Sequence, residues 1–522
     1  MANKNLFQTL RGALLLPKTN AVNEAGGPAY ALEPKQALAQ YAATGCFSRT
    51  FYATAEEQVE RVLELCEKLE PEFVAQVAVY SRERSFLKDM PALLCAWLAT
   101  KDARLHETVF ARVIDSPKML RNYVQILRSG VVGRKSLGSA PKRLVRQWLE
   151  ARDEEALFSG SVGQYPSLAD VLKMVHPKPA TAEREAFYGY MLGRPYETGA
   201  LPKLVFQFEQ FKAGETTDVP DLPFTMLSAL PLSAKDWAEI ARNASWQTTR
   251  MNLNTFARHG VFSDAIVTRQ IAARLRSADE VKRARVFPYQ LLTAYQNTDS
   301  AVPLEVRDAL QDAMELAVTN VPQIEGQVVV CPDVSGSMAS PVTGHRKGST
   351  SAVRCIDVAA LVAAAVVRKN PSAVVLPFEQ AVVEVALNSR DSVMTNAQKL
   401  AALGGGGTNC SAPIARLNQR KTKADLVIFV SDNQSWMDAG QGRGTALMAE
   451  WSVFRQRNPQ SRLVCLDIQP YQSTQAVERA DILHIGGFSD QVFEVVSAFA
   501  SGELEADHWV GRIAAVKLSQ AA

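Results

Sequence analysis

The chain has 522 residues, of which 47% are hydrophobic, so it is long enough for several domains with sizeable cores. Its formal net charge of +3 excludes neither a nucleic-acid partner nor a protein partner. Hydropathy predicts no transmembrane helix, because no run of about 18 apolar residues occurs.

The seven cysteines are scattered through mostly apolar segments, without a Cys-x-x-Cys pair. That distribution predicts reduced, buried thiols rather than a disulfide framework or a zinc site. Reduced thiols are typical of a cytoplasmic protein, and this is the location that we expect.

From about Glu56 to Asn320, apolar residues recur every three or four positions, as in Val59-Val62-Leu63-Cys66-Leu69. This spacing predicts amphipathic α-helices of roughly 10 to 15 residues, separated by short breaks such as Glu70-Pro71. Successive helices with short connections favour an all-α solenoid of stacked helix pairs.

Beyond residue 320, short apolar runs alternate with helical stretches. The predicted strands are 327–331, 373–376, 424–430, 462–468 and 481–485, and the predicted helices are 354–368, 395–402, 411–418, 444–455 and 490–499. Such alternation predicts an α/β doubly wound parallel sheet with helices on both faces. We therefore predict a multidomain chain with domains 1–320 and 321–522. The second domain holds 18 basic and 18 acidic residues, so the surplus charge lies in the first.

Oxygen-bearing side chains follow two predicted strands and a glycine run. The first strand ends in Asp333-Val-Ser335-Gly-Ser337, the glycine run 404–407 precedes Thr408, and a later strand ends in Ser431-Asp432. Loops at the carboxyl ends of parallel strands gather at one crevice, so these groups can meet there. Carboxylate and hydroxyl oxygens suit a hard cation, Mg²⁺ or alternatively Mn²⁺.

Each of these segments also has an ordinary structural interpretation. Ser-x-Ser after a strand is usually a turn or a helix cap, a glycine run is usually a flexible loop, and Asp432 can cap a turn at Asn433. We favour the cation site because all three segments occur together. No histidine falls in these loops and no nucleophile–base pair is evident, so no enzymatic activity is predicted.

The segments DVSGSM, GGGGTN and VIFVSDN resemble the metal-ion-dependent adhesion site of von Willebrand factor A domains. The resemblance implies five cation ligands: Asp333, Ser335, Ser337, Thr408 and Asp432. It also implies that one coordination position can take an acidic group of a partner. Asn409 departs from the acidic residue found in some relatives, which implies a weaker cation affinity.

Basic residues gather in three regions of the helical half. No acidic residue interrupts 118–148, and two further basic groups occur at 173–178 and 242–259. Each run can be a solvated helix face. Together they can line one RNA-binding surface. The candidate RNA-binding residues are Arg121, Arg134, Lys135, Lys142, Arg143, Arg146, Lys173, His176, Lys178, Arg250 and Arg258.

The segments GGPAYAL, FYATAEEQ, VAVYSRE and SLADVLKMVHPKP resemble the TROVE module of the Ro ribonucleoproteins. The resemblance runs from about residue 20 to residue 510. It implies a ring of HEAT-like helical repeats followed by a von Willebrand factor A-like domain.

This resemblance also implies a function. Small noncoding Y-like RNAs would bind the outer basic face of the ring, and single-stranded 3′ ends of misfolded RNAs would enter the central hole. The implied setting is RNA quality control by a monomer in the cytoplasm. An exoribonuclease such as polynucleotide phosphorylase is the implied protein partner, and no membrane is involved.

Two other functions compete with RNA binding. One is a protein-interaction module built on the von Willebrand factor A-like domain, with the basic residues scattered. The other is a metal-dependent nuclease, which would need more than two carboxylates at the cation. We further expect the N-terminal segment 6–32 to pack near the C-terminal domain, because its apolar residues need a partner surface.

Overall fold

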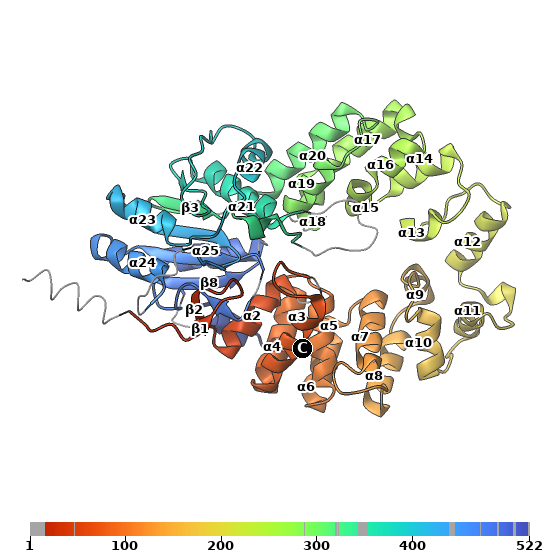
Figure 1. Cartoon of the computed structure of the whole chain (residues 1–522). Helices are drawn as coiled ribbons and strands as arrows, with labels where there is room; N and C mark the ends of the chain where they lie inside the picture. The colour runs from red at the N-terminus through yellow and green to blue at the C-terminus, as the bar shows by residue number, and fades with distance from the viewer. Residues whose placement is uncertain are drawn as a thin grey trace, which may run out of the picture. The chain divides into compact units, whose positions relative to one another are not determined.

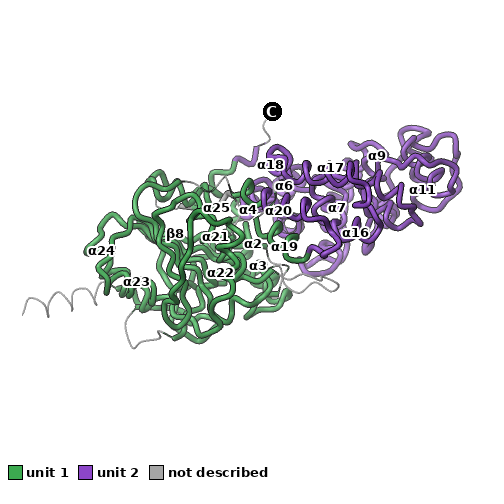
Figure 2. The backbone as a smooth tube through the Cα atoms, turned by 90° about the horizontal axis from the view of Figure 1, so that it is seen from above, with its two compact units in different colours: residues 1–73, 286–297, 314–516 green, residues 74–285, 298–313, 517–522 purple. Residues whose placement is uncertain are grey.

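The computed structural model describes residues 16–45, 47, 49–284, 286, 288–318, 321, 323–342, 353–437, 444–469, 471–487, 490–504 and 508–519. The chain divides into two compact units, each assembled from segments far apart in the sequence (Figure 2). Unit 1 comprises 1–73, 286–297 and 314–516, and unit 2 comprises 74–285, 298–313 and 517–522. The secondary-structure pattern changes near residue 320, as expected, but the domain boundary there stays a prediction because the compact units divide the chain differently.

Unit 2 is built from helices, as the periodicity predicts (Figure 1). Helix α5 (Asp89–Leu98) lies at the centre of its group, with Met90 to Leu98 all buried, and packs on α6 (Ala103–Val113) and α7 (Pro117–Ser129). Polar caps define where helices begin: the Ser116 hydroxyl accepts the amide N–H of Met119 at the start of α7. The remaining helices of the unit are α8 (Ser139–Glu150), α9 (Glu154–Ser159), α10 (Leu168–Val175), α11 (Ala182–Leu192), α12 (Lys203–Ala213), α13 (Phe224–Leu227), α14 (Ala234–Asn243), α15 (Trp246–Met251), α16 (Leu253–Arg258), α17 (Ala265–Leu275) and α18 (Ala278–Ala284).

Two helices run from one unit into the other, namely α4 (Pro71–Glu83) and α20 (Leu304–Ala317). Short 3₁₀ segments η1 (Thr198–Ala200) and η2 (Val261–Ser263) connect helices within unit 2. The all-α HEAT-like character of this half is therefore confirmed at the level of its helices. Closure of the helices into a ring stays a prediction.

Unit 1 contains a five-stranded parallel sheet in the order β4-β3-β5-β6-β8. Its strands are β3 (Val328–Pro332), β4 (Val374–Val375), β5 (Leu426–Ser431), β6 (Arg462–Asp467) and β8 (Ile482–Gly486). Every end of these strands lies within two residues of its predicted position. This parallel sheet confirms the α/β doubly wound prediction. Its strands are continuous apolar runs because both faces of the sheet are covered.

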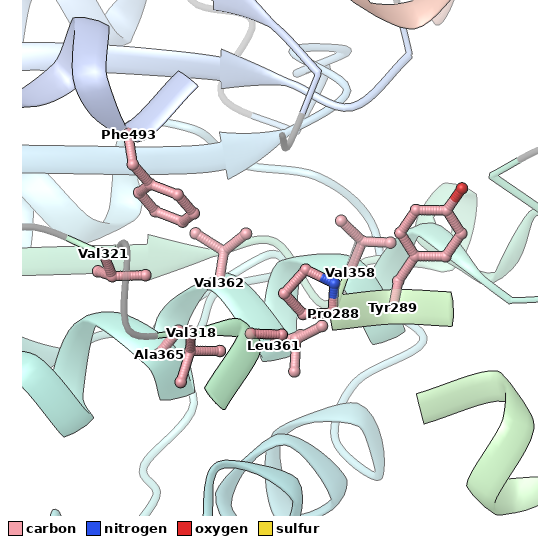
Figure 3. A pocket seen from close by; sticks show the side chains of 10 residues that line it. Pro288, Tyr289, Val318, Val321, Val358, Leu361, Val362, Ala365 and Phe493 are labelled. Carbon is pink, nitrogen blue, oxygen red and sulfur yellow. The ribbon is translucent and has the colours of Figure 1, made fainter. Parts of the chain in front are cut away.

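Helices cover both faces of this sheet. One face carries a core in which Val329, Phe429 and Cys465 pack with Trp451 and other side chains of α23 (Ala412–Gln419) and α24 (Ala446–Arg457). Helices α21 (Cys355–Lys369), α22 (Val393–Ala401) and α25 (Asp490–Ser501) belong to the other side, where α21 packs on β3 and β5. A small apolar cavity of about 20 Å³ lies there between α21, α25 and α19 (Pro288–Gln296), with Phe493, Val362 and Val318 in its wall (Figure 3).

The N-terminal residues join unit 1 through a second, three-stranded sheet. Strands β1 (Ala21–Val22), β2 (Pro28–Ala31) and β7 (Ser473–Thr474) are antiparallel, and Tyr30 pairs with Thr474. Helices α2 (Pro34–Thr44) and α3 (Ala55–Glu67) follow, and α2 packs on β8. The expected contact with the C-terminal part is thus confirmed for 21–31, whereas 6–15 lie outside the described residues.

Tyr30 shows why this N-terminal segment needs the sheet. Its ring is buried in the core that α23 and α24 form with the sheet. Its hydroxyl donates to the carbonyl of Pro17 at 3.0 Å and accepts the N–H of Thr445 at 3.2 Å. A tyrosine whose hydroxyl has partners can be buried without loss of hydrogen bonding.

The buried-thiol prediction holds for the six cysteines in the described part of the chain, each of which is free and buried. Cys46 lies outside it. Among the helices that the structure describes, none has the length and apolar character required to cross a membrane.

The candidate cation site and the basic helices

Two of the three segments of the candidate cation site, the loops after β3 and β5, leave neighbouring strands of the parallel sheet. Strands β3 and β5 pair along their whole length, so Asp333 and Asp432 emerge at the same edge, and both are buried. The N–H of Asp333 donates to the carbonyl of Val430 at 2.9 Å, which extends the pairing to the site itself. The parallel register therefore brings the two carboxylates together.

The loop after β3 turns back on the Asp333 carboxylate. Its Oδ1 accepts the N–H of Ser335 at 2.8 Å, and its Oδ2 accepts the hydroxyl of Ser431 at 2.6 Å. The Ser335 and Ser337 hydroxyls lie 3.3 Å apart, at the beginning of the 3₁₀ helix η3 (Gly336–Ala339). The three predicted ligands of this loop are thus adjacent and buried.

The glycine run fits closely against this loop. Gly405 N–H donates to the carbonyl of Val334 at 3.0 Å, and Gly336 N–H donates to the carbonyl of Gly406 at 2.9 Å. Gly404 has a φ of +87°, and a Cβ there would collide with the Val334 carbonyl, so glycine is required. The run is therefore an ordered part of the site.

Thr408 is joined to the loop after β5. Its carbonyl accepts the N–H groups of Trp436 and Met437 at 3.1 and 3.0 Å, and its side chain is buried. Asn409 is used locally, because its Oδ1 accepts the hydroxyl of Ser411 at 2.8 Å. The structure places all five predicted ligands at this edge of the sheet, and their binding of a cation stays a prediction.

The carboxylates carry charge that the described protein groups do not balance. The pKa of Asp333 is raised mainly by burial and secondarily by the charge of Asp432. Burial also raises the pKa of Asp432. Asp432 Oδ1 accepts the N–H of Gln434 at 3.2 Å, so the predicted turn-capping role is also present. Its Oδ2 is buried without a hydrogen-bond partner among the described residues. A buried acceptor of this kind fits a cation.

Sequence reasoning missed several groups around this site. Ser431 holds Asp333 as described, and Asp467, at the end of β6, accepts a hydrogen bond from Asn433. Burial, and then the charge of Asp432, raise the pKa of Asp467. Asp467 was detectable from the sequence, because it follows an apolar run in the same way as Asp333.

The N-terminal segment also contributes to the site. Asn23 Nδ2 donates to the carbonyl of Ser435 at 2.6 Å, and Glu24 N–H donates to Gln434 Oε1 at 2.8 Å. The Tyr52 side chain lies beside Ser337, and burial, then the charge of Asp432, raise the pKa of Tyr52 to about 12. No local pattern indicates these contacts, because the hydrogen bonds of Asn23 and Glu24 join residues 412 and 410 positions apart.

Three of the predicted RNA-binding arginines are buried or make structural contacts. Arg121 is only 9% exposed. Arg134 Nη1 donates to the carbonyl of Ala99 at 3.0 Å, and Arg146 Nε donates to the carbonyl of Val175, the last residue of α10. Arg134 and Arg146 therefore help to hold the loop before α8 and the end of α10 in place.

Other predicted basic residues lie at the surface. Arg143 forms an exposed ion pair with Glu107, with an N–O distance of 3.1 Å. His176 follows the last residue of α10 with a φ of +48°, and its side chain is exposed. The remaining exposed or partly exposed lysines are Lys135, Lys142, Lys173 and Lys178.

The structure brings together only part of the predicted surface. Helix α10 packs on both α7 and α8, so the basic groups of 118–148 and 173–178 lie on neighbouring elements (Figure 1). Arg250 and Arg258 lie in α15 and α16, which pack among α14, α17 and α18. Arg250 contacts Gln247, and Arg258 contacts Thr255.

Comparisons with known proteins agree with this architecture. A family model described as the Ro60 vWA domain matches residues 327–500. The RNA-binding protein RO60 of Deinococcus radiodurans is 27% identical over 96% of this chain and 100% of its own length. The protein of the same name from Caenorhabditis elegans is 24% identical over 45% of this chain and 37% of its own length.

A solved structure shows the same fold. The crystal structure of the Deinococcus radiodurans RO (RSR) protein aligns with a TM-score of 0.62, covering 90% of this chain and 100% of that one at 23% identity. Helical repeats followed by a parallel-sheet domain are common to both. Residues 327–500 thus match the von Willebrand factor A domain of Ro60 proteins, and the chain is similar to Ro proteins over nearly its whole length.

Proposed function

We propose that this protein is the RNA-binding scaffold of a Ro-type ribonucleoprotein. The observation that carries the proposal is the match to the Deinococcus relative, which spans 96% of this chain and is named an RNA-binding protein. The exposed lysines on α8, α10 and their loops supply the positive charge that a phosphate backbone needs. The proposed function is binding, not catalysis.

In this proposal, small noncoding Y-like RNAs bind the outer basic surface of the helical ring. Single-stranded 3′ ends of misfolded RNAs enter the central hole, and the monomeric particle acts in RNA quality control or processing in the cytoplasm. An exoribonuclease such as polynucleotide phosphorylase is the proposed protein partner.

A divalent cation, Mg²⁺ or Mn²⁺, belongs to the same proposal. Asp333, Ser335, Ser337, Thr408 and Asp432 would hold it, and the unpartnered Asp432 Oδ2 supports this fit. When bound, the cation supplies positive charge to two buried carboxylates and a coordination position for a partner's acidic group. Asp333 and Asp432 would be its two anionic ligands, and Ser431 orients Asp333.

A binding experiment tests the RNA proposal. Lys135, Lys142 and Lys178 are replaced by Ala, because the structure shows no supporting role for them comparable to that of Arg134 or Arg146. We expect weaker binding of a structured RNA. The slope of log K against log salt should fall by about 0.7–0.9 for each RNA phosphate that the variant no longer neutralises.

The matched control removes three exposed lysines from other helices of unit 2, namely Lys203, Lys235 and Lys282. This control should bind RNA as the wild type does. Equal affinity of the wild type and both triple variants, measured across roughly 50–200 mM salt, would contradict the proposed surface. It would favour instead the alternative function, a protein-interaction module centred on the cation site.

A further inference from the structure

An open groove of about 630 Å³ lies within unit 2, between α7, α10 and the loop that precedes α10. Helix α7 contributes Gln125, Arg128 and Ser129 to its wall, and α10 contributes Asp170 and Lys173. Only Lys173 among these belongs to the predicted RNA-binding set. The groove has the size typical of small-molecule sites, and its wall includes three charged side chains, Arg128, Asp170 and Lys173.

Tyr165 forms the loop side of this groove and is 82% exposed. Its φ of +62° lies in the left-handed region, which disfavours residues other than glycine, asparagine and aspartate. Hydrophobic burial does not explain an aromatic ring that the backbone presents to solvent in this way. An observed outlier at a groove indicates a binding role.

The loop that carries Tyr165 is supported from below. Gly163 has a φ of +125°, and a Cβ there would collide with the guanidinium group of Arg121. At the other end of the loop, Ser167 caps α10, and its N–H and hydroxyl donate to Asp170 Oδ2 at 2.9 and 2.8 Å. The backbone is therefore anchored on both sides of Tyr165, whose side chain lines the groove.

The charged side chains in the groove are complementary to the phosphate and the base of one nucleotide. Arg128 and Lys173 are cations that can receive a phosphate. The Asp170 carboxylate accepts hydrogen bonds from Ser167, which lower its pKa, so it is ionised and can accept only from donors such as the N–H groups of a base edge. An exposed aromatic ring stacks on an unpaired base, and a paired base inside a duplex cannot reach it.

We propose that this groove binds one unpaired nucleotide of an RNA, with its base stacked on Tyr165 and its phosphate on Arg128 and Lys173. The inference rests on the proposed RNA-binding function. It adds a site that distinguishes single-stranded from double-stranded RNA. An acidic peptide fits less well, because it carries no base to stack on Tyr165 or to donate to Asp170.

The test compares Tyr165→Ala, Tyr165→Trp and the wild type on a single-stranded oligoribonucleotide and on a blunt duplex of the same sequence. Loss of one stacked base should weaken single-strand binding by about 5- to 150-fold, with little change in the salt slope. Tyr165→Trp should retain binding, and duplex affinity should be the same in all three. Phe206→Ala removes an aromatic ring that is 41% exposed elsewhere in unit 2 and should change nothing.

Charge variants complete the test. Arg128→Ala and Lys173→Ala should each reduce the salt slope for the single strand by up to about 0.7. Equal single-strand affinity of Tyr165→Ala and the wild type, or an equal loss on the duplex, overturns the groove proposal. If the Lys135, Lys142 and Lys178 variant still binds structured RNA more weakly, the proposed function survives that failure. Equal weakening of polyglutamate binding by Tyr165→Ala would overturn the groove proposal in favour of a peptide site.

Discussion

Asp333 and Asp432 are held out of water at the end of adjacent strands, within range of one another's charge. Their types and spacing could be predicted from the sequence, because each ends an apolar run in a parallel sheet. Two further groups belong to the site: the hydroxyl of Ser431, which donates to Asp333, and a third buried carboxylate, Asp467. Sequence did not distinguish the exposed lysines from buried Arg121, because burial of a long side chain depends on which loop covers it.

Replacing Asp333 by Asn separates the roles of charge and shape. Without a divalent cation, Asp333→Asn should unfold at the same temperature as the wild type or a higher one, because it removes repulsion between buried carboxylates. With Mg²⁺ at about 100 times its Kd, the wild type should gain about 2.7 kcal/mol and the variant should gain none.

Thermal unfolding in EDTA and in Mg²⁺ measures both effects. Asp391→Asn is the control, because Asp391 forms an exposed ion pair with Lys399 at 2.9 Å, away from the site. It should respond to Mg²⁺ as the wild type does. An equal gain for Asp333→Asn and the wild type would show that Asp333 does not bind the cation.

At the scale of elements, apolar periodicity was sufficient for the five-stranded sheet and for the helices around it. It was not sufficient for β2 and β7, which are short and pair only through a distant contact. The loop carrying Tyr165 also escaped prediction, because its conformation depends on Arg121 beneath Gly163. Helix α21 illustrates the opposite case, since a helix that is apolar on all sides must lie in the interior.

The apolar cavity beside α21 allows a test of packing (Figure 3). Val318→Ile adds one methylene group where about 20 Å³ is free, so it should raise the free energy of unfolding by up to about 0.8 kcal/mol. Val366→Ile adds the same group at a buried position that does not line the cavity, and overpacking there should cost about 1–3 kcal/mol. Denaturant unfolding should show opposite signs for the two variants.

At the scale of the whole molecule, neither compact unit is a continuous stretch of chain. The expected domains 1–320 and 321–522 describe the change in pattern well. They do not describe which residues pack together, because residues 16–73 belong with the sheet. Long-range pairing cannot be read from local periodicity, and this is the part of the fold that sequence reasoning could not supply.

A fragment of residues 321–516 should therefore be less stable than the same residues in the full chain. It lacks Tyr30, whose ring is buried in the core of the full chain. The cavity left without that ring should lower the free energy of unfolding by about 3–5 kcal/mol if the surrounding side chains do not fill it. Adding a separate peptide of residues 16–73 should raise its unfolding temperature, and the same peptide with Tyr30→Ala should do so less. No difference between the two peptides would contradict the role of Tyr30.

The pairing of β2 with β7 can form only late in the synthesis of the chain. Pro28 and Gln475 hydrogen-bond across a separation of 447 residues, so β2 can pair with β1 early but lacks its second partner, β7, until nearly all of the chain has been synthesised. At about 5–20 residues per second, that delay is on the order of 20–90 s. During this time the edge of β2 and the ring of Tyr30 are open to other contacts. A nascent chain stalled before residue 473 should thus be a substrate for chaperones at its first thirty residues rather than at its growing end.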